Sequence, residues 1–300
     1  MIIQAHIEQG TQHAAAAADS LHRGNVFTQL LHHLEDSREI EIPFTHISLP
    51  QFPPVHILGV TIDLSITKHV FFLWVAALLL CVLLFAAARS NRRRRVPRGW
   101  GNLVEVFVVF VRDEIAIPNM GPGGVKYLPY LLTTFFFILI MNLLGLIPYG
   151  ASSTANVSVT AGLAIIAFVM IQWSAIRAQG LGHYLAHLTG GVHWLLWPIM
   201  VPIEILGLFT KPFALCIRLF ANMTGGHIVI VSLIGLIFLF QSYVVAVAPA
   251  GFVVGIMFLE LFVAFLQAYI FTMLTSLFMG LGMAGAEHGR EAGGDSHGAH

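Results

Sequence analysis

Long apolar runs separated by short polar segments fill the chain from about residue 70 onward. A helix that spans a lipid bilayer needs about 20 apolar residues. Runs of sufficient length predict membrane-crossing helices at about 70–88, 127–147, 157–176, 194–240 and 251–283. The run at 100–117 is shorter and carries four charges, which predicts an amphipathic helix in the membrane interface. The pattern therefore predicts an all-α polytopic membrane protein with about five crossing helices and one interfacial helix.

The fourth run, 194–240, is longer than one perpendicular crossing requires. At a rise of 1.5 Å per residue it would form a helix of roughly 70 Å, whereas the hydrocarbon core is about 30 Å thick. Either two helices occupy this run or one helix crosses with a steep tilt. Gly225-Gly226 is the only turn candidate in 204–240, and the proline-containing segment 241–251 is a better break. We therefore expect two long, strongly tilted helices at the end of the membrane domain; two helices in 194–240 would instead reverse the side of the C-terminal tail.

The charge pattern predicts the orientation. Residues 89–98 include six arginines directly after the first run. Basic clusters beside a span stay on the cytoplasmic side, and this position argues against a nucleic-acid patch. We therefore expect an extracytoplasmic polar segment at 1–64, a membrane domain at 65–284 and a cytoplasmic tail at 285–300.

Composition excludes a soluble protein. Hydrophobic residues make up 57% of the chain, the mean hydropathy is +0.82, and only 10% of residues are charged, against roughly 25% in soluble domains. The 15 basic and 15 acidic residues balance, so no general affinity for nucleic acid is expected. The chain has no G-x-x-x-x-G-K-[ST] motif for a nucleotide, and its cysteines and histidines show no metal-ligand spacing, so neither a cofactor nor a metal is predicted.

Four charged residues lie within or near the last two apolar runs: Glu204, Lys211, Arg218 and Glu260. An ionisable group in the bilayer core costs ~2.5–3.5 kcal/mol on insertion scales, so such groups indicate function. Arg218 lies near the middle of its run and stays protonated, so it needs a carboxylate or water nearby. A structural ion pair between Arg218 and Glu260 is the alternative.

One face of the fourth run is lined by small and cationic residues. They follow each other at steps of three, four or seven residues: Gly207, Lys211, Ala214, Arg218, Ala221, Gly225 and Ser232. Small residues let another backbone approach closely in lipid. The face therefore suits a close, sliding partner, although ordinary packing within the chain is the alternative.

The last two helices are expected to be antiparallel, so the numbers of facing residues add to a nearly constant value. Arg218 and Gln267 add to 485, and His227 and Glu260 add to 487. The second pair is expected nearer the outer side, by about 10–14 Å along the helices. A histidine beside a buried glutamate can pass protons near neutral pH, although a lone, satisfied histidine is the alternative. Glu204 could line an inner water route or contact lipid head groups.

The run KPFALCIRLFANMTGGH at 211–227 resembles subunit a of the rotary F-type ATP synthases. The resemblance extends through NLLGLIP at 142–148, TANVSVT at 154–160 and LQAYIF at 266–271, and covers about 65–284. It implies a stator proton-channel subunit without a nucleotide site, and so no enzyme by itself. The implied partners are a c-ring, peripheral-stalk b subunits and the lipid bilayer of a bacterial-type inner membrane.

The resemblance also implies a role for individual residues. Arg218 would face a carboxylate on each helix of the rotating c-ring, between two offset aqueous half-channels. Asn222 and Gln267 match polar positions near the arginine. Glu204 matches an acidic position of the inner half-channel, and His227 and Glu260 match an acid–histidine pair of the outer one.

Two other classes of membrane protein fit the sequence less well. A secondary transporter predicts repeated halves, and no internal repeat is found. An intramembrane metalloprotease needs H-E-x-x-H or a similar motif, which is absent.

Overall fold

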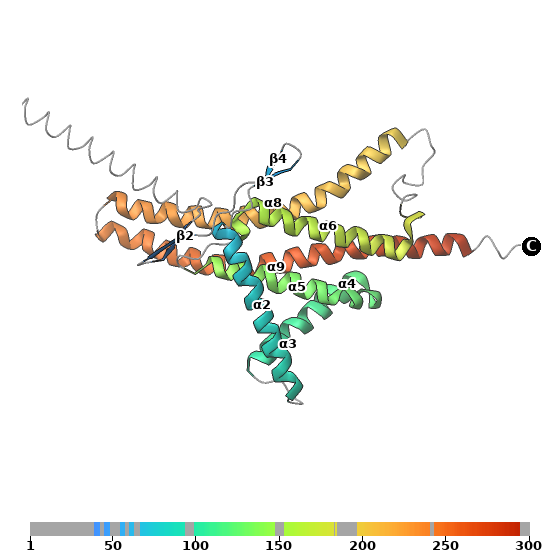
Figure 1. Cartoon of the computed structure of the whole chain (residues 1–300), viewed down its shortest axis with the longest axis horizontal. Coiled ribbons are helices and arrows are strands. Elements are labelled where there is room, and N and C mark those ends of the chain that lie inside the picture. The colour runs from blue at the N-terminus through green and yellow to red at the C-terminus, as the bar shows by residue number, and fades with distance from the viewer. Residues whose placement is uncertain are drawn as a thin grey trace, which may run out of the picture. The chain divides into compact units, whose positions relative to one another are not determined.

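The chain consists almost entirely of helices where its structure is described. The computed structural model describes residues 39–42, 45–48, 55–57, 60–62, 67–93, 99–147, 153–182, 184, 197–240 and 243–294. The main helices, labelled in Figure 1, are α2 (Lys68–Arg93), α3 (Trp100–Phe110), α5 (Leu128–Gly145), α6 (Val157–Gln179), α8 (Trp197–Phe240) and α9 (Tyr243–Gly294). By contact, the chain forms two compact units: unit 1 comprises 1–68 and 223–262, and unit 2 comprises 69–222 and 263–300.

Five helices in the described part of the chain are long and apolar enough to cross a membrane. Their apolar segments are Lys68–Arg89, Pro122–Gly145, Val157–Gln179, Pro198–Ile237 and Val247–Met283. These segments confirm the five crossing helices and the all-α class of the membrane domain. The tilt of the last two helices stays a prediction.

Four short strands stand outside this helical class and were not predicted. β1 (Glu39–Ile42) pairs antiparallel with β2 (Thr45–Ser48), and β3 (Val55–Ile57) pairs antiparallel with β4 (Val60–Ile62). Both hairpins lie in the polar N-terminal segment, where isoleucine, valine and threonine favour strands.

The fourth apolar run is one helix, as the sequence favoured. α8 runs from Trp197 to Phe240 with Pro202 and Pro212 inside it. Neither proline nor Gly225-Gly226 ends the helix. In lipid, a break would leave backbone N–H and C=O groups without hydrogen-bond partners, so the helix continues.

The helix that contains the predicted last crossing, 251–283, is longer than that crossing. α9 begins at Tyr243 and ends at Gly294, and its apolar segment is Val247–Met283, so the predicted end of the crossing agrees and its predicted start is four residues late. Pro249 lies within the second turn of α9, so it removes only one backbone hydrogen bond near the helix start. At the other end, alanine, glutamate and arginine are good helix formers, and they extend α9 into the predicted tail.

The predicted interfacial helix is helical but not uniform. α3 continues into a π-helix, η1 (Val111–Ala116), and then into α4 (Ile117–Met120). A proline at 118 clashes with the preceding turn of a regular α-helix, and the wider π turn accommodates it. The Ile115 carbonyl accepts hydrogen bonds from Asn119 Nδ2 at 2.8 Å and Ser276 Oγ at 3.0 Å. The place of this segment in the interface stays a prediction.

An asparagine cap and a glycine mark the two ends of α6. Its N-cap is Asn156, whose side-chain oxygen accepts a hydrogen bond from the Ser158 amide at 2.8 Å. The helix ends before Gly180, whose φ of 82° lies in the left-handed region that favours glycine. The cap explains why α6 begins where the sequence predicted.

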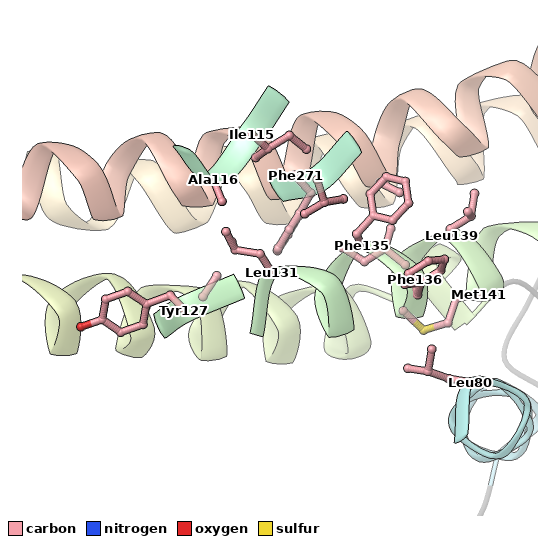
Figure 2. Close-up of a cluster of buried hydrophobic side chains, with 14 of the residues drawn as sticks. Leu80, Ile115, Ala116, Tyr127, Leu131, Phe135, Phe136, Leu139, Met141 and Phe271 are labelled. Carbon is pink, nitrogen blue, oxygen red and sulfur yellow. The ribbon is translucent and has the colours of Figure 1, made fainter. Parts of the chain in front are cut away.

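The core of unit 2 lies between α5, α9 and the π-helical segment. Figure 2 shows Leu131 and Phe135 of α5 near Phe271 of α9 and Ile115 of η1. These four side chains are at most 1% exposed. Ring contacts extend this core, with Phe135 and Phe265 centroids 5.9 Å apart. Such contacts fix α9 by close van der Waals packing, which is the main source of helix association in lipid.

Candidate functional site

Arg218 lies exposed on α8. It makes no hydrogen bond or ion pair with another residue that the structure describes. The neighbouring positions Leu215 and Leu219 are 1% and 0% exposed and face the core of unit 2. α8 therefore turns the arginine away from its own core. Glu260, the partner in the alternative ion pair, belongs to unit 1 whereas Arg218 belongs to unit 2, so that alternative stays a prediction.

The small residues beside Arg218 are exposed as well. Gly207, Ala214 and Ala221 are exposed in unit 2, and Gly225 and Ser232 are exposed in unit 1. A Cβ atom built on Gly207 or Gly225 would meet nothing within 4 Å. Among the described residues, no packing covers Gly207 or Gly225, and the sliding partner stays a prediction.

Lys211 is the member of this face that has a contact of its own. It is half-buried, and its Nζ lies 5.0 Å from the centre of the Phe278 ring of α9. A cation over an aromatic face is attracted by the ring quadrupole. Lys211 is thus held by α9, which leaves Arg218 as the cation of this face without a described partner.

Asn222 and Gln267 join α8 to α9 within unit 2. Asn222 Nδ2 donates a hydrogen bond to Gln267 Oε1 at 2.7 Å. Gln267 is 3% exposed, and its Nε2 is buried without a hydrogen-bond partner among the described residues. The pair therefore presents one unused donor.

Gln267 contacts Asn222, which lies one helical turn beyond Arg218, the residue that the index sum placed at the same level as Gln267. The shared level of Arg218 and Gln267 stays a prediction. Side chains on a helix lean toward its N-terminus, and on antiparallel helices they lean in opposite directions. Two side chains that touch therefore belong to residues with a larger index sum than two residues whose Cα atoms lie at the same level.

His227 and Glu260 meet in unit 1, as the index sum predicted. His227 Nδ1 lies 3.9 Å from Glu260 Oε1, and the side chains are 21% and 9% exposed. This distance exceeds that of a hydrogen bond. Glu260 Oε1 is buried without a hydrogen-bond partner among the described residues. A buried carboxyl group beside an imidazole can bind or release a proton in response to small changes in its surroundings.

Glu204 lies half-buried on α8, in the neighbourhood of Tyr184. Burial, and then the Glu204 carboxylate, raises the pKa of the Tyr184 phenol. The Tyr184 hydroxyl donates to Gln172 Oε1 at 2.6 Å. Nothing in the sequence pattern had linked Tyr184 to Glu204, because the two lie 20 positions apart in the sequence.

A buried polar cluster in unit 2 was also missed. Thr154 Oγ1 donates to Asn142 Oδ1 at 2.7 Å, and Ser153 Oγ donates to the His69 carbonyl at 2.8 Å. Asn142 is 1% exposed inside an apolar helix. That placement is the signal that could have identified it, because polar side chains inside a membrane helix need partners.

The six predicted residues thus form separate arrangements. Asn222 contacts Gln267 in unit 2, and His227 contacts Glu260 in unit 1. Within the described part of unit 2, neither Arg218 nor Glu204 forms a hydrogen bond or salt bridge with Asn222 or Gln267. No group of three or more His, Cys, Asp or Glu side chains in the described ranges could hold a metal ion.

A comparison with protein families supplies the decisive observation. The model of the ATP synthase A chain family matches residues 70–280. The chain belongs to this family.

Individual relatives agree with the ATP synthase A chain assignment. The chain is 50% identical to "ATP synthase subunit a" of Chloroherpeton thalassium over 268 residues, which are 88% of this chain and 79% of the relative. It is 52% identical to "ATP synthase subunit a 2" of Chlorobaculum tepidum, over 90% of this chain and 75% of the relative. It is 55% identical to "ATP synthase subunit a" of Myxococcus xanthus, over 78% of each chain.

The family match includes every candidate residue from Glu204 to Gln267. Membership makes the chain an integral membrane subunit of the ATP synthase, with a part in proton transport and no catalytic nucleotide site.

Proposed function

We propose that this member of the ATP synthase A chain family is the stator half of the proton channel. It delivers protons to c-ring carboxylates through one aqueous half-channel and receives them through a second, offset one. Rotation of the ring past Arg218 couples proton flow to ATP synthesis. The observation that carries the proposal is an exposed arginine without a described intrachain partner, on a helix face made of small residues.

Arg218 acts on the ring carboxylate by electrostatics. A permanent cation nearby favours the ionised carboxylate, so a proton leaves as the ring helix reaches the arginine. The interaction is stronger in a low dielectric than in water. The carboxylate binds a proton again only after it has moved away. Because the guanidinium keeps its own proton, it also separates the two half-channels and prevents a direct leak.

The small residues define how the ring can approach. Gly207, Ala214 and Ala221 leave the backbone of α8 accessible on the exposed face. A ring helix can then pass close to the guanidinium without large side chains interlocking. Asn222 binds the Oε1 atom of Gln267, which leaves its Nε2 donor unused. This donor can form a hydrogen bond with water or a carboxylate in this region.

The two half-channels are assigned to the remaining acidic residues. His227 and Glu260 form the proton relay of the outer half-channel, supported by their 3.9 Å approach and by the unsatisfied Glu260 Oε1. Glu204 lines the inner half-channel, supported by its half-buried position on α8. The N-terminal segment then faces the outside of a bacterial-type inner membrane and the C-terminus faces the cytoplasm, with b subunits and lipid as further neighbours.

Substitution of Arg218 tests this function. In membranes containing the complete ATP synthase, Arg218→Ala is expected to abolish ATP-driven proton pumping. Arg218→Lys is expected to abolish nearly all of it, because lysine can deprotonate and lacks the guanidinium fork. The control is Arg177→Ala, which removes an exposed arginine at the end of α6 and is expected to retain pumping. Pumping at the unsubstituted rate in Arg218→Ala membranes would refute the proposal.

A further inference from the structure

The carboxyl group of Glu260 lies directly against the backbone of Gly226. A Cβ atom built on Gly226 would overlap Glu260 Oε1 and would lie 2.9 Å from Cδ and 3.0 Å from Cγ. Both residues belong to unit 1. The carboxyl group therefore occupies the volume that any side chain at position 226 would need.

Backbone conformation does not explain this glycine. Gly226 lies inside the continuous helix α8, and the positive-φ glycines of the described chain are Gly99, Gly121 and Gly180. A glycine in the middle of a helix lowers helix stability relative to alanine. At this position, the close approach of the Glu260 side chain is the feature that an added Cβ atom would disturb, because the carboxyl group would have to move.

The same approach places the carboxyl group beside His227. Glu260 contacts two successive residues of α8: the bare backbone of Gly226 and, at 3.9 Å from Oε1, the Nδ1 atom of His227. Proton exchange needs the two groups within hydrogen-bond reach or bridged by one water. A small rotation closes 3.9 Å to a hydrogen bond, whereas displacement of the carboxyl group would open the gap.

We propose that Gly226 is a positioning residue that seats the Glu260 carboxyl group beside His227. Because residue 226 has no side chain, the Glu260 carboxyl group can pack against its backbone. A Cβ atom at position 226 would push Glu260 Oε1 away from the His227 imidazole. This inference rests on the proposed role of Glu260 in the outer half-channel and extends it to a residue with no titratable group. It predicts that the size of residue 226 controls the rate of proton entry.

The first test compares two glycine-to-alanine variants in the complete ATP synthase. Gly226→Ala is expected to lower proton flux by about tenfold or more, because misplacement of a reacting group by about 1 Å can cost up to a hundredfold. The control is Gly255→Ala on α9, where a Cβ atom would meet nothing within 4 Å. It is expected to change flux by no more than about twofold. Equal flux in the two variants overturns the proposal.

A rescue separates positioning from general damage to the helix. Glu260→Asp shortens the acid by one methylene and withdraws it from the added methyl group. Because the shorter acid also lies farther from His227, this rescue is measured as the amount of chain in the membrane and not as flux. If Gly226→Ala lowers accumulation, the overlap predicts that Glu260→Asp restores it. Failure of this rescue contradicts the proposal.

Glu260→Gln distinguishes this inference from the function on which it rests. Unchanged flux in Glu260→Gln removes Glu260 from the route, and the positioning role falls with it. Slow flux in Glu260→Gln together with equal flux in Gly226→Ala and Gly255→Ala leaves the half-channel standing and overturns only the role of Gly226.

Discussion

Arg218 and Glu260 are both ionisable residues in apolar helices, but they differ in exposure and in their neighbours. Arg218 is exposed and has no described partner, whereas Glu260 is 7% exposed and lies beside His227. An arginine inside a span costs ~2.5–3.5 kcal/mol unless something compensates it. Its compensation must therefore come from outside the described chain. Glu260 can avoid the cost by taking up a proton, which is what a relay requires.

At the same residue scale, Glu260→Gln is expected to slow proton flux through the complete ATP synthase by at least about tenfold. An amide cannot take up and release a proton, whereas a positioned acid or base contributes about 10²–10⁴-fold to proton transfer. The measurement is dye-monitored acidification of membrane vesicles at neutral pH. Glu114→Gln, at an exposed glutamate of the π-helical segment, serves as the control and is expected to have no effect. Equal fluxes in the two variants would remove Glu260 from the route.

The helices agree with the sequence prediction wherever a long apolar run indicated them. The five crossing helices and the single α8 were predictable because a lipid-spanning backbone has few alternatives to a helix. The start of α9 was not predictable from Pro249, because a proline beyond the first turn usually breaks or kinks a helix, whereas here it lies inside one. The π turn at Val111–Ala116 was missed because it depends on Pro118 and on the hydrogen bond from Ser276 of α9 to the Ile115 carbonyl. That hydrogen bond joins residues far apart in the sequence, so no local pattern indicates it.

The packing of α9 gives a prediction at the scale of elements. A Cβ atom on Gly280 would overlap the Asn119 carbonyl oxygen and lie 2.8 Å from its carbon, and backbone cannot move aside cheaply. Gly280→Ala is therefore expected to destabilise unit 2 by about 1–3 kcal/mol. Gly162→Ala on α6, where a Cβ atom would meet nothing within 4 Å, is the control. The check is the thermal midpoint of the detergent-solubilised chain, and equal midpoints would contradict this packing.

On the scale of the whole molecule, the chain carries a face of small and cationic residues that we propose the c-ring covers. The sequence was sufficient to find that face and the His227–Glu260 contact, because helical periodicity and antiparallel order depend on residue numbers alone. It was not sufficient for the Asn222–Gln267 contact, which depends on how side chains lean, or for Gly226, whose role depends on the path of the Glu260 side chain.

Crosslinking to the c-ring tests the central claim most directly. In a chain whose native Cys81 and Cys216 are replaced by alanine, a cysteine at Ala221, three residues from Arg218 on the exposed face, is combined with a cysteine one turn from the ring carboxylate. Oxidation in the assembled complex is expected to join the two subunits. A cysteine at Leu78, which is 65% exposed on α2, is expected to form no such product. Crosslinking from Leu78 but none from Ala221 would contradict the claim that the arginine face meets the ring.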